Sequence, residues 1–201
     1  MPSSPTPAPT APRPEGWLPL LRQLLVWVLV ALLLRTFVIE PRWIPSGSML
    51  PTLQLQDRVL VEKLRAHRPA SLPLGSIVVF HPPAALVAAG YDPEAALIKR
   101  IVAAPGDTVE VRGGQLFRNG APVQPDWAPE PINYSLPPLT VPPGHHLVLG
   151  DNRNASLDSH LWGPLPDGQL IGAAVWRYWP LSRFGPLGRR PIGPPGEIVK
   201  Q

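Results

Sequence analysis

Two serines flank a glycine at Ser46 and Ser48, inside a short stretch whose backbone is restricted by Pro45 and Pro51. A rigid turn that presents a hydroxyl is suited to a nucleophile. A serine hydroxyl is a weak nucleophile, however, until a neighbouring base removes its proton. A Ser-Gly-Ser turn is also common as a plain loop or a helix cap, so this stretch predicts catalysis only if the chain supplies a base.

Lys99 is the candidate base. It lies in a predicted strand over residues 97–103, where the two-residue period places it on the same face as Leu97 and Ile101. One interpretation is that its aliphatic stem packs there while the ammonium reaches water. The other is burial, which lowers the pKa of the amine toward the range of a general base. The adjacent Arg100 stays protonated and cannot serve as a base.

A third polar block, residues 150–163, follows a predicted strand and reads GDNRNASLDSHLWG. Its composition fits turns closed by Asn and Asp side chains, and it lacks the spacing of an EF-hand calcium loop. His145 and His146 have no carboxylates at ligand spacing, and we interpret them as part of an edge strand. The chain has no cysteine, which excludes disulfides, thiolate ligands and a cysteine nucleophile.

The elements that position these residues are predicted to be mainly β-strands. Of 201 residues, 44% are hydrophobic, too many for a disordered protein, and 31 are prolines, which argue against a helical bundle. Gly113-Gly114 and Asn119-Gly120 predict tight hairpins, and long surface loops are expected at residues 82–93 and 121–143. Short β-rich runs predict strands at residues 58–63, 76–81, 97–103, 108–112, 115–118, 145–149 and 169–178.

The N-terminal region is of a different kind. Residues 1–16 are rich in proline without apolar periodicity, and we expect a disordered arm there. Residues 17–39 are strongly apolar and long enough for a transmembrane helix, with Arg22 and Arg35 near the ends. A buried core helix and the apolar part of a cleavable signal peptide are the alternatives. Basic residues are balanced on its two sides, so they do not fix its orientation.

We expect a β-rich domain over residues 40–180 and a basic tail rich in Pro and Gly over residues 181–201. The net charge of +4 equals that of residues 177–201, where five basic residues stand against one acidic residue. Trp176, Tyr178 and Trp179 precede most of this charge. One interpretation is that these aromatic side chains contact a bilayer interface, where anionic lipid would also attract the basic tail. The other is that they form a core cluster on the last strand.

Five blocks together resemble the type I signal (leader) peptidases of bacterial type. Members of this family are membrane-anchored serine proteases with a Ser-Lys dyad. The blocks are Glu40-Pro41 and residues 44–53, 57–63, 99–107 and 150–163, and they follow the anchor in the order of the family. The resemblance covers residues 37–179. It implies a mainly antiparallel β-sheet catalytic domain, of the fold shared with SOS-repressor proteases, behind one N-terminal transmembrane helix.

Carried over by motif, the resemblance implies that Ser48 is the nucleophile and Lys99 its general base. Ser46 would donate its hydroxyl to the oxyanion together with the backbone N–H of Ser48. Ser156 would orient the lysine amine. Asp158 is implied to brace the Ser156 loop, and Arg100 and Asp151 are implied to form a supporting ion pair.

The implied activity is the removal of signal peptides from exported precursor proteins. The substrate would add as an extended strand to an open sheet edge, with small residues entering shallow pockets. No metal or organic cofactor is needed. The expected partners are signal peptides and the lipid bilayer, not nucleic acid, with the β-rich domain on the extracytoplasmic side of a plasma, inner or thylakoid-type membrane. The residues implied to line the pockets are Ile44, Met49, Leu53, Leu97 and Ile98.

The chain departs from the family pattern at Gln56, where many members have Gly, at Asn154, where many have Asp, and at His160, where others carry Arg. Two alternatives stay open. A self-cleaving Ser-Lys repressor would need a DNA-binding helix-turn-helix, which residues 1–40 do not offer. A non-catalytic anchored β-module that binds peptides or lipid would leave Ser48 as a turn residue only.

Overall fold

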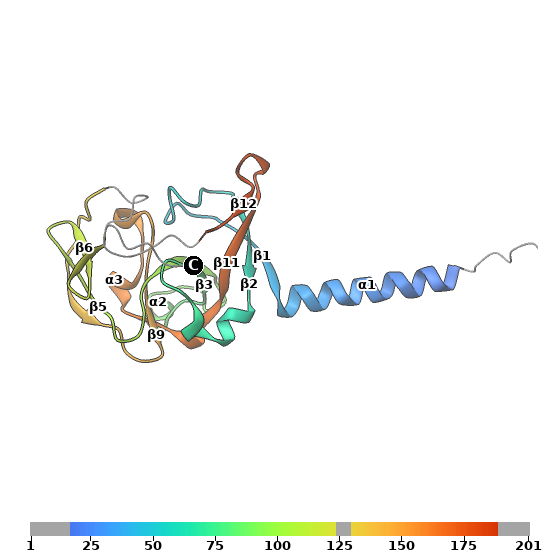
Figure 1. The fold of residues 1–201 in the computed structure, drawn as a ribbon, viewed down its shortest axis with the longest axis horizontal. Coiled ribbons are helices and arrows are strands. Elements are labelled where there is room, and N and C mark those ends of the chain that lie inside the picture. Colours follow the sequence, from blue (N-terminus) through green and yellow to red (C-terminus); the bar gives the residue numbers. More distant parts are fainter. Residues whose placement is uncertain (1–16, 124–129, 189–201) are drawn as a thin grey trace, which may run out of the picture.

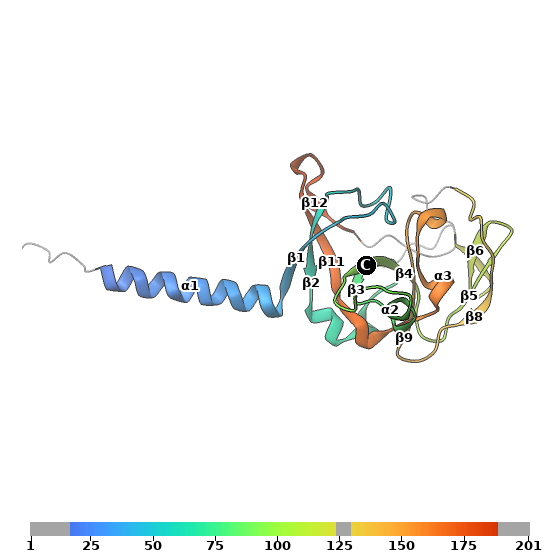
Figure 2. The same ribbon diagram turned by 180° about the vertical axis from the view of Figure 1, so that it is seen from behind.

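The structure, a computed structural model, describes residues 17–123 and 130–188. The expected N-terminal arm and most of the expected tail lie outside this range. Within it, a long helix, α1 (Trp17–Phe37), projects from one side of a β-domain (Figures 1 and 2). By length and composition α1 can cross a membrane, and none of its residues is buried against the domain. The core-helix alternative is therefore wrong.

The junction between α1 and the β-domain is tied by hydrogen bonds. The expected anchor ran to residue 39, but α1 ends at Phe37 and the chain passes directly into strand β1 (Ile39–Trp43). The backbone N–H of Lys63 donates to the carbonyl of Val38 (2.9 Å), and its Nζ donates to the carbonyl of Thr36 (2.9 Å). These bonds satisfy carbonyl groups that the end of a helix leaves without partners.

The larger sheet has the order β1-β2-β11-β3-β4-β9-β10, with all neighbours antiparallel, and β12 pairs with β11. The five strands predicted in this region are confirmed, with bounds that agree to within one residue. Their bounds are β2 (Arg58–Glu62), β3 (Ile77–Phe80), β4 (Leu97–Ala103), β9 (His145–Leu149) and β11 (Leu170–Trp179). Three strands of this sheet were not predicted: β1, β10 (Leu165–Pro166) and β12 (Gly185–Pro186). The interpretation of His145 and His146 as part of an edge strand is wrong, because both residues pair with β10 and β9 lies between β4 and β10.

A smaller sheet, in the order β7-β6-β5-β8, lies at the end of the domain far from α1 (Figure 2). The predicted strands β5 (Thr108–Arg112) and β6 (Gln115–Arg118) are confirmed. Both hairpin turns have positive φ at their two central residues, as the Gly-Gly and Asn-Gly pairs predicted. The long loop expected at residues 121–143 is wrong, because it contains β7 (Ala121–Val123) and β8 (Leu136–Thr140).

Short helices fill several connections. The region expected as a loop at residues 82–93 holds α2 (Ala84–Ala88), and the polar block ends in α3 (Ser159–Trp162). Single 3-10 turns occur at Leu64–His67, Pro69–Ser71, Arg153–Ala155, Asp167–Gln169 and Leu181–Arg183. Because β12 pairs with β11, ordered structure extends past residue 180, where we expected the tail to begin.

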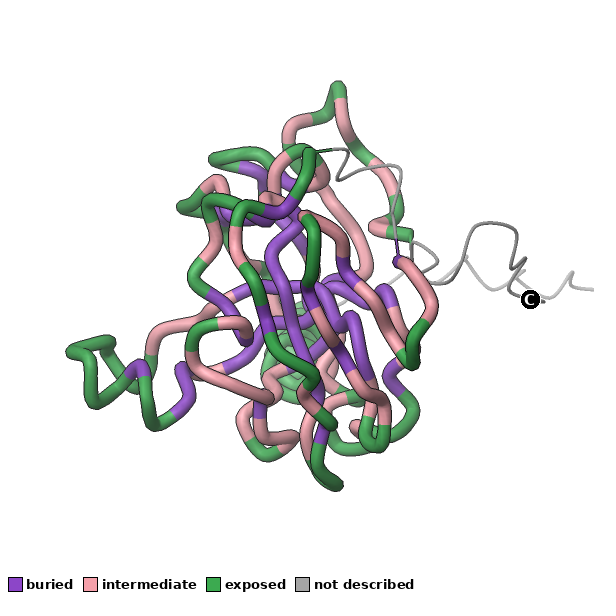
Figure 3. Tube along the Cα trace, turned by 90° about the vertical axis from the view of Figure 1, so that its left-hand side faces the viewer, coloured by how far each residue is buried: buried purple, intermediate pink, exposed green. Residues whose placement is uncertain are grey.

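Buried residues run through the middle of the domain (Figure 3). Among the described residues, the core consists of three apolar clusters. One cluster includes residues of the smaller sheet together with residues of β4 and β9, and the other two clusters include residues of β3 and β4. Met49 and Leu53, from the loop between β1 and β2, belong to one of these two clusters and are fully buried. The Ser-Gly-Ser turn is therefore fixed to the large sheet by its own neighbours.

Candidate active site

The loop at residues 44–57 closes on itself. At its ends, the N–H of Ile44 donates to the carbonyl of Asp57, and the N–H of Gln56 donates to the carbonyl of Ile44 (both 2.9 Å). Inside it, the N–H of Leu53 donates to the carbonyl of Met49 (2.9 Å). This bonding, together with the burial of Met49, gives the serine next to it a fixed position.

Ser48 and Lys99 meet inside the protein although 51 residues separate them. The Nζ of Lys99, on β4, lies 2.9 Å from the Oγ of Ser48 and 3.0 Å from the carbonyl oxygen of Ile98. Ser48 is 9% exposed and Lys99 5% exposed. The structure thus brings the candidate nucleophile and the candidate base into one buried hydrogen bond. Of the two interpretations of Lys99 that the sequence left open, burial is the correct one.

Burial changes the chemistry of the Lys99 amine. It lowers the pKa of Lys99 from 10.5 to about 8, against the opposing effect of the Asp158 carboxylate, which raises it. With a pKa of 8, about one molecule in ten holds a neutral amine at pH 7, compared with about one in 3,000 for a pKa of 10.5. A lysine in this position is able to accept a proton near neutral pH.

Ser46 lies beside the same hydroxyl. Its Oγ is 3.4 Å from the Oγ of Ser48, and the residue is exposed where Ser48 is buried. The two hydroxyls therefore form a short row from the surface inward, with Lys99 at the inner end. A carbonyl group approaching Ser48 from the solvent side would come close to the hydroxyl of Ser46.

The loop at residues 150–158 packs directly on the nucleophile turn. A Cβ at Gly150 would lie 2.5 Å from the carbonyl oxygen of Ser48 and would overlap the side chain of Ser156. Only glycine permits this approach of the two backbones. Asn152, which we did not single out from the sequence, donates from its backbone N–H to the carbonyl of Ser48 (3.1 Å) and from its side chain to the carbonyl of Gly47 (3.2 Å).

Asp158 forms hydrogen bonds with this loop and with the start of α3. Its Oδ2 accepts from the N–H of Gly150 (2.8 Å), and its Oδ1 accepts from the N–H of His160 (3.3 Å) at the start of α3. The Nδ1 of His160 lies 2.6 Å from the same Oδ1, and the imidazole is stacked on the ring of Tyr134 at 3.8 Å. At the position where the resemblance led us to expect Arg, this chain thus has a histidine that contacts the carboxylate.

Ser156 is the site residue that lacks its expected contact. Within the described part of the chain, its Oγ is buried and has no hydrogen-bond partner, Lys99 included. Its side chain lies beside Gly150 and the main chain of Ser48, as the overlap with a Gly150 Cβ shows. Its role as the group that orients the lysine amine stays a prediction.

Arg100 and Asp151 form the expected ion pair under the site. The guanidinium binds the carboxylate with two bonds, Nε to Oδ1 at 2.7 Å and Nη2 to Oδ2 at 2.5 Å, and both side chains are fully buried. Nη1 also donates to the carbonyl of Gly75 (2.6 Å). This pairing ties β4, beside Lys99, to the loop that contacts Ser48.

The residues expected to line substrate pockets separate into two groups. Ile44, Met49, Leu53 and Ile98 are buried in one core cluster beneath the Ser48 turn, while Leu97 is half-buried in another. On β4, residues 97–99 pair with β3 on one side, but β9 pairs only from Arg100 onward. Within the described residues, this leaves one edge of β4 unpaired beside Lys99.

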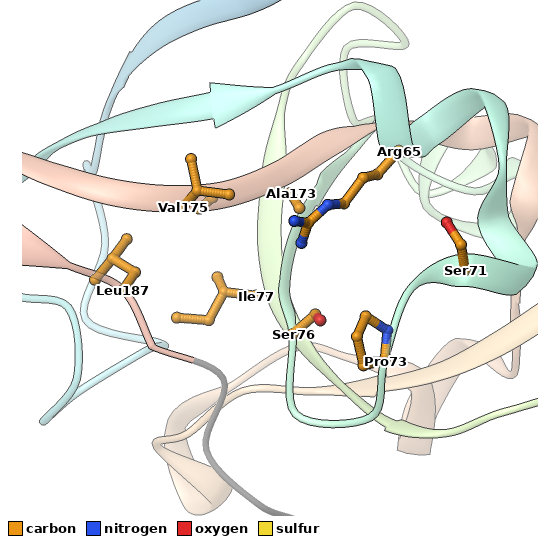
Figure 4. Close-up of a pocket in the computed structure, with 9 residues that line it drawn as sticks. Arg65, Ser71, Pro73, Ser76, Ile77, Ala173, Val175 and Leu187 are labelled. Carbon is orange, nitrogen blue, oxygen red and sulfur yellow. The ribbon is translucent and has the colours of Figure 1, made fainter. Parts of the chain in front are cut away.

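A separate pocket of about 480 Å³ lies between β11 and the β2–β3 connection, away from the dyad (Figure 4). Neither Ser48 nor Lys99 lines it. Its walls include Arg65, Ser76 and Leu187. Arg65 is already paired with Glu62, Nε to Oε2 at 3.1 Å, so this pocket provides no second candidate for catalysis.

Comparison with known proteins agrees with this geometry. The family model described as signal peptidase, peptidase S26, matches residues 17–179. The probable signal peptidase I-1 of Synechocystis sp. is 48% identical over 200 residues, covering 99% of each chain. The signal peptidase I of Leptolyngbya laminosa is 44% identical over 194 residues, 94% of this chain and 95% of that one.

A plant protein is similar as well. The probable thylakoidal processing peptidase 2 of Arabidopsis thaliana is 49% identical over 162 residues, which cover 80% of this chain and 43% of that protein. The region matched by the family model, residues 17–179, includes α1, the Ser48 turn, Lys99 and the loop at residues 150–158. The chain therefore belongs to the signal peptidase family, peptidase S26.

Proposed function

We propose that this protein is a membrane-anchored endopeptidase that removes signal peptides from exported precursor proteins, with Ser48 as nucleophile and Lys99 as general base. The observation that carries the proposal is the buried hydrogen bond of 2.9 Å between the Nζ of Lys99 and the Oγ of Ser48. Family membership supplies the substrate class. A buried lysine with a pKa of about 8 supplies the base.

The reaction follows from these two groups. Neutral Lys99 takes the proton of Ser48 while the Oγ attacks the carbonyl carbon of the scissile peptide bond. The resulting oxyanion accepts a hydrogen bond from the hydroxyl of Ser46 and from the backbone N–H of Ser48. Lys99 then gives its proton to the leaving amine, the C–N bond breaks, and an ester with Ser48 remains. Lys99 then takes a proton from a water molecule as that water attacks the ester carbon, and it returns the proton to the Oγ of Ser48 as the C–O bond of the ester breaks.

The neighbouring loop supports the base and the nucleophile. Asp158 holds the loop through Gly150, and the ion pair between Arg100 and Asp151 ties this loop to β4. We assign Ser156 the role of orienting the Lys99 amine, because its hydroxyl is buried beside the Ser48 main chain and has an unused hydrogen-bonding capacity within the described residues.

The substrate is an extended peptide that adds to the unpaired edge of β4 at residues 97–99. Hydrogen bonds to this edge place the scissile carbonyl near Ser48. We expect small side chains at the cleavage site to enter shallow pockets next to the buried cluster beneath the Ser48 turn. The residues assigned to these pockets are Ile44, Met49, Leu53, Leu97 and Ile98, of which Leu97 is the most exposed.

The enzyme is held in the membrane by α1, and the β-domain lies on the extracytoplasmic side of a plasma, inner or thylakoid-type membrane. The helix has the length and composition of a membrane-spanning helix. The relatives of the chain include a probable signal peptidase I and a probable thylakoidal processing peptidase. The side on which precursors emerge after export is the side where their signal peptides become accessible to Ser48.

The test is precursor processing by the purified full chain in detergent. We expect Ser48→Ala and Lys99→Arg to abolish cleavage, the second because a guanidinium stays protonated. Ser71→Ala is a matched control, since this exposed serine bonds only to the carbonyl of Arg68 (2.7 Å) among the described contacts. Cleavage by a folded Ser48→Ala variant at the parental rate would favour the non-catalytic alternative.

A further inference from the structure

The nucleophile loop has a second attachment, made by the C-terminal hairpin of β11 and β12. Arg183, in the turn of this hairpin, donates from Nη1 to the Oδ1 of Asp57 (3.0 Å) and from Nη2 to the carbonyl oxygen of Thr52 (3.2 Å). Thr52 lies four residues after Ser48, and Asp57 closes the loop. One guanidinium thus bridges two points of the loop that presents Ser48.

Arg177, on β11, holds the same point from another direction. Its Nη1 donates to the carbonyl oxygen of Thr52 (3.1 Å) and lies 3.7 Å from the Oδ2 of Asp57. Its Nε donates to the carbonyl of Arg183 (2.6 Å), which fixes the hairpin turn itself. Two arginines therefore converge on one backbone carbonyl and one carboxylate.

The carboxylate at the centre is buried. Asp57 is 1% exposed, and its Oδ2 also accepts from the N–H of Gln54 (2.9 Å). A buried carboxylate without a cation is strongly unfavourable. The fold nevertheless brings two cations to it, and burial together with the nearby Arg183 lowers the pKa of Arg177. The second arginine adds repulsion, so charge balance alone does not explain its position.

The shared target of the two arginines explains the arrangement. Between Thr52 and Ser48 the chain forms tight turns, with the N–H of Leu53 bonded to the carbonyl of Met49 and the N–H of Leu50 bonded to the carbonyl of Gly47. A shift of Thr52 is therefore passed to Ser48. An error of about 1 Å in the placement of a reacting group can reduce a rate about a hundredfold.

We infer that Arg177 and Arg183 are positioning residues, which hold Ser48 at attacking distance from Lys99 and the substrate by fixing the Thr52 carbonyl and Asp57. The inference rests on the proposed dyad. It changes the interpretation of Arg183, which we had assigned to a basic, lipid-attracting tail. Both side chains are mostly buried, 17% and 23% exposed, and their donors face the nucleophile loop.

The test uses the full chain in detergent micelles, with a precursor that carries a signal peptide as substrate. We expect Arg183→Gln and Arg177→Gln each to lower kcat about tenfold or more, with KM within about twofold of the parent. The apparent pKa of the pH–rate profile should not move, because Lys99 keeps its burial. Arg112→Gln is the matched control, since Arg112 is exposed on the smaller sheet and should leave kcat unchanged.

Two further measurements separate positioning from other roles. In a double-mutant cycle, Arg183→Gln combined with Asp57→Asn should lose little more than the worse single variant, because both changes break the same contact. The loss in kcat should also be equal in phosphatidylcholine vesicles and in vesicles that contain phosphatidylglycerol, whereas a lipid-binding role would make the loss appear only with the anionic lipid.

Arg183→Lys addresses folding, because it retains the charge beside Asp57 but cannot reach Thr52 and Asp57 together. We expect it to fold like the parent and to recover only part of kcat. The inference would be overturned if both Gln variants kept the parental kcat, or if their kcat fell only in anionic vesicles. It would also be overturned if kcat fell only at temperatures at which the variant is unfolded. Ser48→Ala would be inactive in all of these cases, so the proposed dyad is tested separately.

Discussion

Replacing Lys99 with methionine should abolish cleavage and at the same time make the fold more stable at neutral pH. The folded protein holds this lysine with a pKa of about 8, below the ordinary value of 10.5, because the amine is buried. Between these two pH values the unfolded chain binds a proton that the folded chain does not bind. The free energy of unfolding therefore rises with pH across this window.

The size of the effect follows from the same two pKa values. Below pH 8 both states are protonated, and the folded state carries the full cost of the buried charge, about 3 kcal/mol at about 1.4 kcal/mol per pH unit. Methionine removes this cost but also the bonds of Nζ to Ser48 and Ile98, worth about 1 kcal/mol each. We expect a net gain of about 1–2 kcal/mol at pH 7.

The pH dependence distinguishes this cause from ordinary repacking. By pH 9.5 the parent should have recovered about 2 kcal/mol, since its lysine is then neutral in the folded state, and the advantage of the methionine variant should vanish. Chemical denaturation of both proteins in the same detergent at pH 7 and pH 9.5 measures the two differences. Lys63→Met is the control, because that ammonium is partly exposed and bonded to Thr36.

The reasoning would be refuted by a stability difference that stays constant between pH 7 and pH 9.5, because Lys99 would then carry no pH-dependent cost in the folded state. A Lys99→Met variant that is folded and still cleaves precursor would refute the dyad itself. The parent should show cleavage that rises with pH through an apparent pKa near 8, and Lys99→Met should show no cleavage at any pH.

Three further predictions concern the surroundings of the dyad. Asp158→Asn should shift the pH–rate profile to lower pH, because the Asp158 carboxylate raises the pKa of Lys99, and initial rates from pH 6 to 10 measure the shift. Gly150→Ala should destabilise the domain by about 1–3 kcal/mol in thermal melts and lower kcat, because the new Cβ would overlap its neighbours. Trp179→Ser combined with Leu181→Ser should weaken the binding of a fragment starting at residue 38 to anionic liposomes about tenfold or more. The reason is that the two side chains are 47% and 70% exposed, and unchanged sedimentation with the liposomes would contradict this prediction.

The strands that the sequence did not reveal share one physical feature. β1, β7, β8, β10 and β12 each contain proline, which removes a hydrogen-bond donor and weakens the strand signal. Among the described residues, each of the five has a neighbouring strand on one side only, where such a residue is tolerated. The central strands, free of proline, were predicted to within one residue. Proline thus marked edges of the two sheets, whereas we had interpreted the region of β7 and β8 as a loop and the region of β12 as a tail.

The departures from the family pattern have a local explanation in the structure. Gln56 adopts a positive φ of 68°, a conformation that glycine takes without strain, which accounts for the glycine of other members. Asn154 uses its side chain to bond the N–H of Asn133 (2.8 Å) and the carbonyl of Pro131 (3.0 Å). The sequence identified these positions as unusual but gave no indication of their partners.

The contact between Ser48 and Lys99 was predictable because both residues lie in motifs of the resemblance, and the same is true of Asp158 and the Arg100–Asp151 pair. The attachments made by Arg183 and Asn152 were not predictable. Thr52 and Arg183 are 131 residues apart, and their bond joins a backbone carbonyl to a side chain in a region that we had interpreted as tail. No periodicity or spacing encodes such a contact. Asn152 was missed for a related reason, since its bonds to Gly47 and Ser48 depend on how two loops meet.

The site balances two opposing requirements on Asp158. Its carboxylate is needed to hold the loop that packs on Ser48, yet its negative charge favours the protonated form of Lys99 and so opposes the base. Hydrogen bonds from the N–H of Gly150 and contact with the imidazole of His160 satisfy that carboxylate locally. Burial remains the larger effect on the Lys99 amine. The brace can therefore lie close to the base without removing its ability to accept the proton of Ser48.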